Sequence, residues 1–460
     1  MAEPTLSEKL VAHHVGLRLE QIPEAVLDSA KLHVLDSLGC LIVGSRLEPG
    51  KLAYNLAVAT SGSAGSQATA TLFGTGARVS YIDAVQAMSA AAHCGEMDDI
   101  HGGAGACIGG MIVPALIAMA EKFGGSGRRF LEAVVVGYET TARIGLTINA
   151  PTLFARGWWP SSICGAFGVA AAGAKYLDWA ADEAANALGI ASLNSGGMIT
   201  GGNEGATARH LIFGRAAQNG IVSLLAAEHG LTGPKRAFED PRGFCLTLCS
   251  EPKWEYLEDT DRYHLLDVAF KPYPCARQLH AGVEALLTLM RQYNVTPDMI
   301  EEIELSVPTP NATMVSRPLT PISRAATLGS GQYVMAVTAH RHKMDLESFD
   351  EQCLNNWEVH ALMRKVKVTG ERELDRHFPQ YWPGRVTLKL AQGQVYTHEV
   401  IIPKGERLNP MTAAEVKEKF LSLAVPVLGE AKGWTVVDQV QSLGDRNSLK
   451  ELLSALRPSS

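Results

Sequence analysis

The first half of the chain follows a helical pattern of hydrophobic positions. From Ser7 to about Gly230, segments rich in Ala, Leu and Val are separated by Gly, Pro, Asn and Ser breaks, and strand-like alternation is nearly absent. Val113–Lys122 and Ala166–Leu177 are apolar around their whole circumference, which is typical of buried central helices. The sequence therefore predicts a helical core with more than one layer.

The pattern changes after Lys271. Ala281–Tyr293 has helical spacing, and the stretches that follow alternate like strands. The predicted strands are Ile300–Val307, Val366–Thr369, Gly384–Leu390 and Thr397–Ile402. Beyond a polar break at 403–410, Met411–Leu423 and Ser448–Leu456 return to helical spacing, with Thr412 and Ser448 as expected N-caps. We expect these last helices to rejoin the first domain.

Length, charge and cysteine usage narrow the class of protein. A chain of 460 residues exceeds the roughly 250–300 at which a single core stops growing, so two domains are expected. The net charge of −7 and the lack of a dense Lys/Arg block argue against nucleic acid as a partner. Apolar runs fall short of the roughly 20 residues that cross a bilayer, so no membrane span is expected.

The beginning of the chain and its cysteines indicate a cytoplasmic protein. The segment MAEPTLSEKL has neither the apolar core of a signal peptide nor the Arg-rich pattern of a transit peptide. The 8 cysteines are scattered without CxxC pairs. We expect free thiols rather than disulfides.

The densest polar cluster in the helical half is His93–His101, followed by the small-residue run Gly102–Gly110. Carboxylates beside histidines suit proton transfer, because proximity and partial burial can bring their pKa values toward neutrality. A solvated helix end, with acidic residues at the next helix N-terminus, is an equal alternative. A metal site built from Glu96, Asp98, His101 and Cys107 ranks below both, because the spacing matches no closed zinc signature. We predict no metal.

Two further motifs suggest a pocket. Trp158 and Trp159 precede a buried helix and could line an apolar pocket, although packing in the core or in a dimer is the favoured interpretation. Arg209 follows the small-residue loop Asn194–Gly205 and is suited to hold a carboxylate by paired hydrogen bonds. The glycines of that loop do not have phosphate-binding spacing, so a nucleotide fold is not supported.

Phe270–His280 lies at the boundary between the helical and α+β parts. Interdomain clefts are favoured ligand sites, and Lys271, Arg277 and His280 could all face one. A hinge with basic residues in solvent is the alternative. We prefer the functional interpretation, because a cation, a phenol, a thiol, a guanidinium and an imidazole together are unusual for a hinge.

Taken in order, several segments resemble the MmgE/PrpD family, which includes 2-methylcitrate dehydratases, cis-aconitate decarboxylases and iminodisuccinate epimerases. The pattern is most similar to the fungal-type cis-aconitate decarboxylases, and the likeness covers nearly the whole chain. It is carried by Leu35–Gly39, Glu96–His101, Gly157–Pro160, Ala170–Leu177, Gly214–Gly220 and Lys271–Cys275.

The resemblance implies a mainly α fold with a large all-helical domain and a smaller α+β lid domain. We predict that residues 1–266 and 403–460 form the first and residues 267–402 the second. It also implies a homodimer and chemistry without a cofactor, in which a proton is removed next to a carboxylate in the interdomain cleft. The expected partner is a small carboxylate substrate.

The family's site residues are carried over one by one. The predicted catalytic residues are Glu96, Asp98, His101, Cys107 and Lys271, and the predicted substrate-binding residues are Trp158, Trp159, Arg209, Tyr273, Cys275, Arg277, His280 and Met314. Cys107 and Trp159 stand where family members usually have histidine, and Arg209 where they have lysine. Met314 replaces a tyrosine that some members carry ahead of the Arg-Pro pair Arg317-Pro318.

These replacements change the chemistry that is available. Tryptophan cannot transfer a proton near pH 7, and arginine can bind an anion but hardly acts as an acid or base. We therefore weigh a lyase, of dehydratase or decarboxylase type, against an isomerase, epimerase or cyclase for a larger, more apolar carboxylate. A non-catalytic family member is a third class. A compact cationic cleft favours the lyase, a wide aromatic cleft the isomerase or cyclase, and a blocked cleft the non-catalytic protein.

Overall fold

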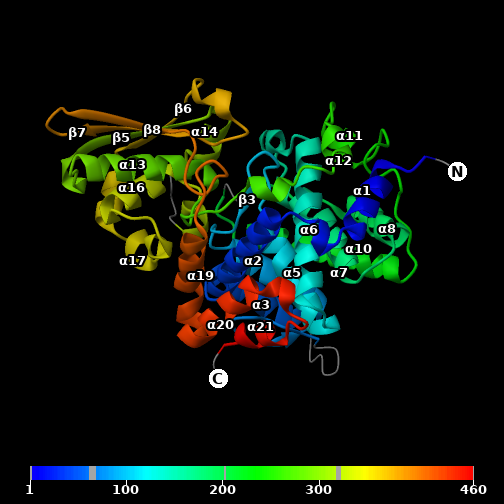
Figure 1. Cartoon of the computed structure of the whole chain (residues 1–460). Helices are drawn as coiled ribbons and strands as arrows, with labels where there is room; N and C mark the ends of the chain where they lie inside the picture. The colour runs from blue at the N-terminus through cyan, green and yellow to red at the C-terminus, as the bar shows by residue number, and fades with distance from the viewer. Residues whose placement is uncertain (1–2, 62–68, 201–203, 318–322, 459–460) are drawn as a thin grey trace.

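The computed structural model describes residues 3–61, 69–200, 204–317 and 323–458. Most of these residues form one large helical body, and a smaller lobe with a sheet projects from its side (Figure 1). The large body contains α1 (Leu6–Gly16), α2 (Glu24–Gly44), α3 (Glu48–Ser61), α4 (Tyr81–His93), α5 (Gly109–Phe123), α6 (Gly127–Thr147), α7 (Pro160–Tyr176), α8 (Ala181–Asn194), α10 (Ala208–Glu228), α11 (Phe244–Leu248), α12 (Glu255–Glu258), α19 (Ala413–Leu428), α20 (Glu430–Gln441) and α21 (Lys450–Ala455).

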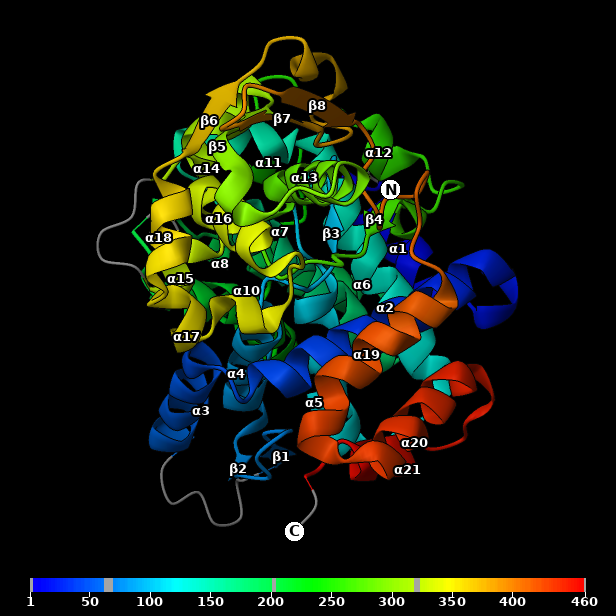
Figure 2. The same cartoon turned by 90° about the vertical axis from the view of Figure 1, so that its left-hand side faces the viewer.

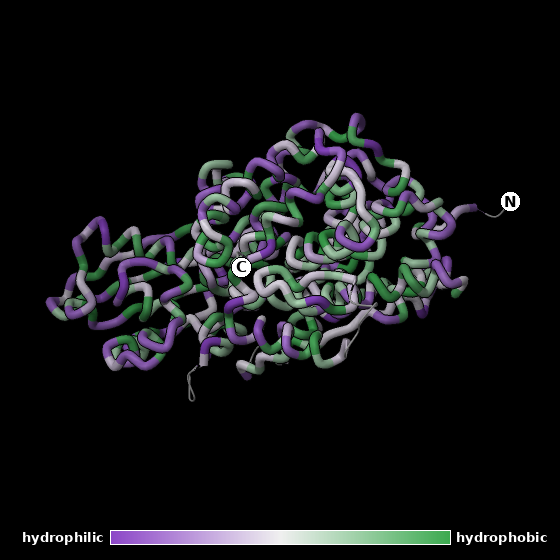
Figure 3. Tube along the Cα trace, turned by 90° about the horizontal axis from the view of Figure 1, so that it is seen from below, coloured by the Kyte–Doolittle hydropathy of each residue, from purple (hydrophilic) through white to green (hydrophobic). Residues whose placement is uncertain are grey.

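The centre of the large body consists of the helices that the sequence predicted to be buried. Every residue of α7 is buried, and α5 is buried from Gly109 to Ala120. Helices α2, α4, α6 and α10 pack around them, so the core has several layers, as predicted. Hydrophobic segments run through this body in Figure 3, whereas the smaller lobe has hydrophilic segments along its outer edges. Within the described residues, no helix combines the length and apolarity needed to span a bilayer.

The smaller lobe is a four-stranded sheet covered on one face by helices. The strand order is β6-β5-β7-β8, with β5 and β6 parallel and the other neighbours antiparallel. The strands are β5 (Ile300–Val307), β6 (Val366–Gly370), β7 (Gly384–Leu390) and β8 (Val395–Val400). The helices of the lobe are α13 (His280–Gln292), α14 (Thr309–Val315), α15 (Arg324–Thr327), α16 (Gly331–Arg341), α17 (Glu351–Leu354) and α18 (Trp357–Met363). Helices α13 and α16 lie against the sheet (Figure 1).

The mainly α fold with a smaller α+β part is confirmed, and so are most of the predicted elements. Strand β8 begins at Val395, two positions before the expected start, because its pairing with β7 continues to Lys389. The N-cap prediction is right for Thr412, whose hydroxyl accepts from the backbone of Glu415, and wrong for Ser448. The last helix begins at Lys450 after Leu449, and helix α20 had not been predicted at all.

Two hydrophobic cores follow the two bodies. The first joins residues between Leu10 and Ala269 to others between Phe420 and Leu456, and the second lies between Cys275 and Val400. Helix α19 runs beside α2 in both Figure 1 and Figure 2, so the C-terminal segment packs on the N-terminal half. The residue numbers proposed for the domain boundaries stay a prediction.

Short two-residue strands tie the loops together. One pair joins β1 (Ala70–Thr71) to β2 (Arg78–Val79). The other joins β3 (Ile100–His101) to β4 (Val268–Ala269), so the loop after α4 lies beside the chain that leads to Lys271. Paired residues that are 169 and 167 positions apart in sequence thereby come together, and this place forms part of the wall of a cavity.

A buried ion pair attaches α19 to this region. Lys419 on α19 lies 2.6 Å from a carboxylate oxygen of Asp36 on α2 and donates a hydrogen bond of 2.6 Å to the carbonyl of Met97. Both charged side chains are buried, so neither can exchange its partner for water. Helix α19 therefore fixes the position of the loop that carries Glu96 and Asp98.

Replacing Lys419 by alanine should destabilise the protein by about 3–5 kcal/mol, because Asp36 would be left buried without its counter-charge. Urea unfolding followed by circular dichroism measures the change. Glu418→Ala, on the exposed side of the same helix, should stay within about 0.5 kcal/mol of the parent. The double variant Asp36→Asn, Lys419→Met should recover most of the loss; a loss below about 1 kcal/mol for Lys419→Ala would mean that the pair does not support the fold.

Candidate active site

A compact cavity lies where the large body meets the smaller lobe. Its volume is about 80 Å³, and its lining comes from the loop after α4, the start of α7, α10, the segment after β4, α14 and the chain around Trp382. The polar residues of the lining are His93, Glu96, Cys107, Ser161, Arg209, Lys271, Arg277, Gln278 and Arg317. Residues from both hydrophobic cores therefore contribute to a single site.

Glu96 lies at the centre of the charged lining. Helix α4 ends at His93, and three residues later Glu96 adopts a left-handed backbone conformation with φ of 52°. Such a conformation is unfavourable for a residue with a side chain and persists where surrounding contacts enforce it. Here those contacts are ionic, since Glu96 forms an ion pair with Arg209 and lies 3.4 Å from the Lys271 ammonium.

These cations determine the ionisation of Glu96. Burial by itself would raise its pKa, but Arg209, His93 and Lys271 together hold the pKa of Glu96 well below its ordinary value. The sequence had suggested a carboxylate with a pKa near neutrality, and for Glu96 that expectation is wrong. Glu96 is therefore an anion near pH 7.

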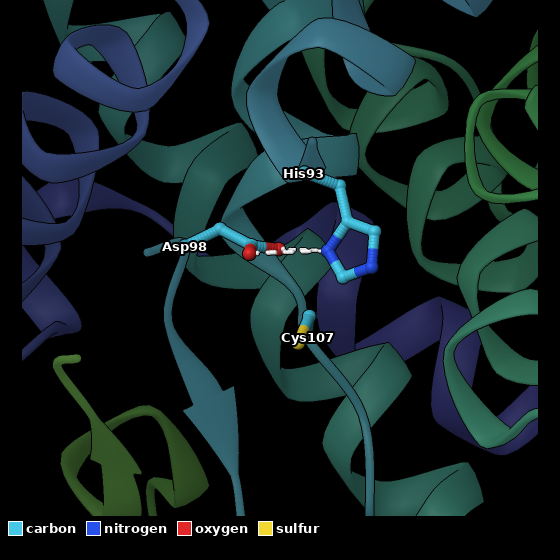
Figure 4. A group of neighbouring side chains, drawn as sticks. All are labelled: His93, Asp98 and Cys107. Atoms are coloured by element: carbon cyan, nitrogen blue, oxygen red, sulfur yellow. Dashed lines mark hydrogen bonds and ion pairs between the residues drawn. The ribbon is translucent and has the colours of Figure 1, made fainter. Parts of the chain in front are cut away.

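His93 forms a dyad with Asp98. Its Nδ1 lies 3.1 and 2.9 Å from the two oxygens of Asp98 (Figure 4). Its ring stacks on Phe213 with 4.2 Å between centroids. Nδ1 is the nitrogen that meets the Asp98 carboxylate, so the other nitrogen, Nε2, points away from it. Nε2 lies 3.4 Å from Nη2 of Arg209, at the cavity wall. The contact with Asp98 therefore fixes the orientation of the His93 ring.

Lys271 and Cys107 complete the polar wall. The Lys271 ammonium lies 3.6 Å from the Cys107 sulfur and 3.6 Å from an oxygen of Asp98. Burial alone would lower the pKa of Lys271, but Cys107, Asp98 and Glu96 raise it above its ordinary value. Burial, reinforced by Asp98, raises the pKa of the Cys107 thiol well above its ordinary value. Lys271 is therefore a cation and Cys107 a neutral thiol near pH 7.

The same corner offers ligand atoms for a metal ion. His93, Asp98 and Cys107 place one such atom each within 4.8 Å of one another. The Lys271 ammonium already lies next to two of these three residues and supplies the positive charge that a metal ion would bring. The donor set is therefore arranged around an ammonium group.

A second guanidinium faces the cavity from the smaller lobe. Arg317 donates from Nε to the carbonyl of Met314 at 2.7 Å, which aims its end group at the cavity. Burial and the nearby charge of Arg209 lower the pKa of Arg317 to about 10. Two guanidiniums that oppose each other's charge across a cavity favour an anion between them. Arg277 also lines the cavity, but its charge is paired with Glu406 at 2.6 Å.

The remaining wall is apolar and aromatic. Trp159 lies against Arg209, with 5.4 Å from the guanidinium carbon to the ring centroid, and against the His93 ring. Its neighbours in the lining are Ile100, Phe154, Ile199, Met314 and Trp382. The cavity thus has one charged side and one apolar side, and Trp159 lies where the two meet.

The structure separates the predicted site residues into two groups. Lining the cavity, or in direct contact with its polar wall, are Glu96, Asp98, Cys107, Lys271, Trp159, Arg209, Arg277 and Met314. The others lie elsewhere: Trp158 faces a different groove, His101 faces a second cavity, and Tyr273, Cys275 and His280 lie outside the lining. His280 contacts Arg277 at 3.1 Å and the Cys275 carbonyl at 3.1 Å, so it orients Arg277 from behind.

Sequence reasoning missed His93 and Arg317 as site residues. Both belong to motifs that had been noticed, since His93 opens the acidic cluster and Arg317 belongs to the Arg-Pro pair. The position of His93 as the last residue of a helix, three before Glu96, was a usable signal. Pro318 and residues 201–203 of the small-residue loop lie outside the described residues.

Comparison with known proteins identifies the family. The MmgE/PrpD N-terminal domain matches residues 8–257, and the MmgE/PrpD C-terminal domain matches residues 273–443. The chain belongs to the MmgE/PrpD family. The resemblance seen in the sequence is thereby confirmed.

Several MmgE/PrpD proteins match over nearly their whole length. The cis-aconitate decarboxylase-like protein oryM of Aspergillus oryzae is 28% identical over 96% of this chain and 95% of its own. The cis-aconitate decarboxylase of Aspergillus terreus is 28% identical over 96% and 94%, and that of Mus musculus is 27% identical over 95% and 91%. The compared regions include every MmgE/PrpD motif noted above.

His101, outside the compact cavity, should make stability depend on pH. Burial lowers the pKa of His101 to about 4 from the ordinary 6.5. Between these two pH values the unfolded chain binds a proton at this residue and the folded protein does not. Stability from this residue is complete above pH 6.5 and is lost as the pH falls toward 4. Between pH 7 and pH 5 the loss is about 2 kcal/mol.

Urea unfolding at pH 7, 6 and 5 tests this. The variant His101→Gln should lose about 2 kcal/mol less than the parent between pH 7 and pH 5, whatever its stability at pH 7. His229→Gln, at an exposed position, serves as the surface control. Equal slopes for the parent and His101→Gln would contradict the assignment.

Proposed function

We propose that this protein is a cofactor-independent lyase that removes a small group, carbon dioxide or water, from a small carboxylate substrate in the compact cavity. The observation that carries the proposal is the charge of the lining. Arg209, Lys271 and Arg317 face the cavity, while Glu96 is the carboxylate among the described lining residues. Two guanidiniums and an ammonium that face one cavity are suited to hold the carboxylate of a substrate.

The compactness of the cavity favours the lyase over the alternatives weighed from the sequence. A volume of about 80 Å³ suits an acid of a few carbons better than a large secondary-metabolite intermediate. The presence of a cavity lined by charged groups speaks against a non-catalytic protein with a filled site. The relatives named as cis-aconitate decarboxylases support the same class of reaction.

The residues divide into binding and proton-handling groups. Arg209 and Arg317 would hold one carboxylate, and the Lys271 ammonium would stabilise the negative charge that develops on the substrate in the transition state. In a decarboxylation the carbon–carbon bond breaks, its electron pair stays on the substrate, and carbon dioxide leaves. A proton then adds to that carbon. In a dehydration the base takes a proton from the carbon next to a carboxylate, and the departing hydroxide takes a proton to become water.

The proton-handling residue is His93. Its Nε2 faces the cavity while Asp98 holds Nδ1, an arrangement that orients the ring and stabilises its protonated form. Cys107 and Trp159 occupy positions where family members have histidine, and neither is suited to this task near pH 7. His93 would therefore carry the proton in this chain.

Incubating the protein in D₂O with cis-aconitate, 2-methylcitrate or citrate, and following the mixture by NMR, tests the proposal. We expect loss of carbon dioxide or water from one of them. Arg209→Gln, Lys271→Ala and His93→Gln should each reduce kcat/KM at least about 100-fold, because each removes a group that acts in the transition state. Lys51→Ala, at an exposed position, is the matched control.

The other results have defined meanings. Deuterium entering the substrate without loss of a group would indicate an isomerase or epimerase and would overturn the lyase. No change in any of the three acids with folded protein would contradict a small polycarboxylate as the substrate.

Trp159→His should raise kcat/KM for cis-aconitate at least about tenfold, because it restores a proton-carrying ring at a family position and removes apolar volume beside Arg209. Steady-state kinetics measures the effect. Trp158→His, one position away and outside the cavity lining, should leave kcat/KM within about twofold. An unchanged or lower value in a stable Trp159→His variant would mean that Trp159 does not limit this reaction.

A further inference from the structure

A second, larger cavity lies on the other side of the loop that carries Cys107. Its volume is about 610 Å³. Its lining consists of His101, Gly102, Gly103, Leu146, Asn149, Lys253, Tyr256, Arg262, His264, Asp267, Pro379, Gln380, Tyr381, Glu406, Arg407 and Leu408. None of these residues lines the compact cavity.

The two cavities share a thin wall. Along strand β3 and the following loop, Ile100, Gly105 and Cys107 line the compact cavity, whereas His101 and its neighbours line the larger one. Alternation along a strand sends successive side chains to opposite faces, so Ile100 and His101 necessarily separate. This segment therefore contributes side chains to both cavities.

Direct contacts cross this wall at two further points. The indole nitrogen of Trp382, in the compact cavity, donates a hydrogen bond of 3.1 Å to the carbonyl of Pro379, in the larger one. Arg277, in the compact cavity, is ion-paired at 2.6 Å with Glu406, in the larger one. A ligand in the larger cavity would thus contact Pro379 and Glu406, which are bonded to Trp382 and Arg277 of the compact cavity.

His101 presents an unused hydrogen-bond donor in this wall. Its Nδ1 accepts a hydrogen bond of 3.1 Å from the backbone N–H of Ala104, which leaves the ring hydrogen of the neutral form on Nε2. Nε2 is buried and has no hydrogen-bond partner among the residues that the structure describes, and the side chain as a whole is 4% exposed. A buried donor without an acceptor is costly, and a ligand with an acceptor oxygen would relieve that cost.

The cavity also carries excess positive charge. Asp267 is its main carboxylate, and it is shared by Arg262 at 2.7 Å and Arg407 at 2.8 Å. The ammonium of Lys253 has no ion-pair partner within the described part of the chain. The negative charge of Glu406 is already neutralised by Arg277. An anion in this cavity would meet cations whose charge is not fully balanced.

A metal ion fits the same residues less well. His101, His264 and Asp267 each offer one ligand atom within 4.8 Å of the others. However, both oxygens of Asp267 are engaged by guanidiniums, and the free nitrogen of His101 carries a hydrogen rather than an electron pair. Two cations beside the carboxylate favour an anion over a cation.

We infer that this second cavity binds an organic or inorganic polyanion, a molecule with two or more carboxylate or phosphate groups, at a site separate from the catalytic cavity. His101 donates to it from Nε2, and Lys253, Arg262 and Arg407 balance its charge. Because the wall is shared, binding there is linked to the position of Cys107, Trp382 and Arg277.

Calorimetric titration with two probes, citrate and inorganic pyrophosphate, tests this site and distinguishes the carboxylate from the phosphate source. We expect at least one probe to bind the parent protein. Arg209→Gln, which weakens anion binding in the catalytic cavity, should retain that binding event within about twofold. Lys253→Gln and His101→Gln should each weaken it at least tenfold, and Lys51→Gln, an exposed matched control, should not.

Other outcomes overturn the inference. They are the absence of binding by both probes, or binding that is lost in Arg209→Gln and kept in Lys253→Gln. A third is zinc binding that disappears in His264→Gln while neither polyanion binds, which would assign the cavity to a metal. Because these readouts measure binding and not turnover, they can succeed or fail independently of the lyase activity. Circular dichroism of each variant excludes unfolding as the cause.

Discussion

The site depends on one buried anion, Glu96, held by cations from two other parts of the chain. Removing a carboxylate from water is costly, and only close opposite charges offset that cost. Arg209 comes from α10 and Lys271 from the chain after β4, while Glu96 itself lies in the loop after α4. Their mutual attraction requires all three segments to meet, so assembly of the fold and assembly of the cavity are the same event.

The rest of the architecture excludes water from this network and fixes the positions of the segments that form it. The β3–β4 pairing brings the segment of Lys271 beside the acidic loop, and Lys419 holds the backbone of Met97 from the C-terminal side. The apolar wall around Trp159 excludes water from one side of the cavity. Charges in such surroundings interact more strongly than they would in solvent. A cavity of this kind can distinguish a carboxylate group from a neutral one.

The same loop serves two cavities because it is partly extended. His101 was expected beside Glu96 and Asp98, since all three belong to one short motif. In the extended segment, however, adjacent side chains diverge, and His101 turns toward His264 and Asp267. Proximity in sequence therefore gave the wrong neighbour for His101. For His93, helix termination brings the ring back to Asp98, five positions later.

Much of the architecture followed from local patterns. Apolar residues around whole circumferences predicted the buried α5 and α7, alternation predicted the strands of the smaller lobe, and motif order identified the family. These features depend on short-range periodicity, which a single sequence records directly.

The site was only partly predictable from sequence. Lys271, Cys107 and Trp159 could be singled out from their motifs, but the state of Glu96, the His93–Asp98 dyad and the second cavity could not. These depend on distances between segments that are up to 175 positions apart, and on burial, which sets the strength of every charge interaction. Tertiary structure alone decides both quantities.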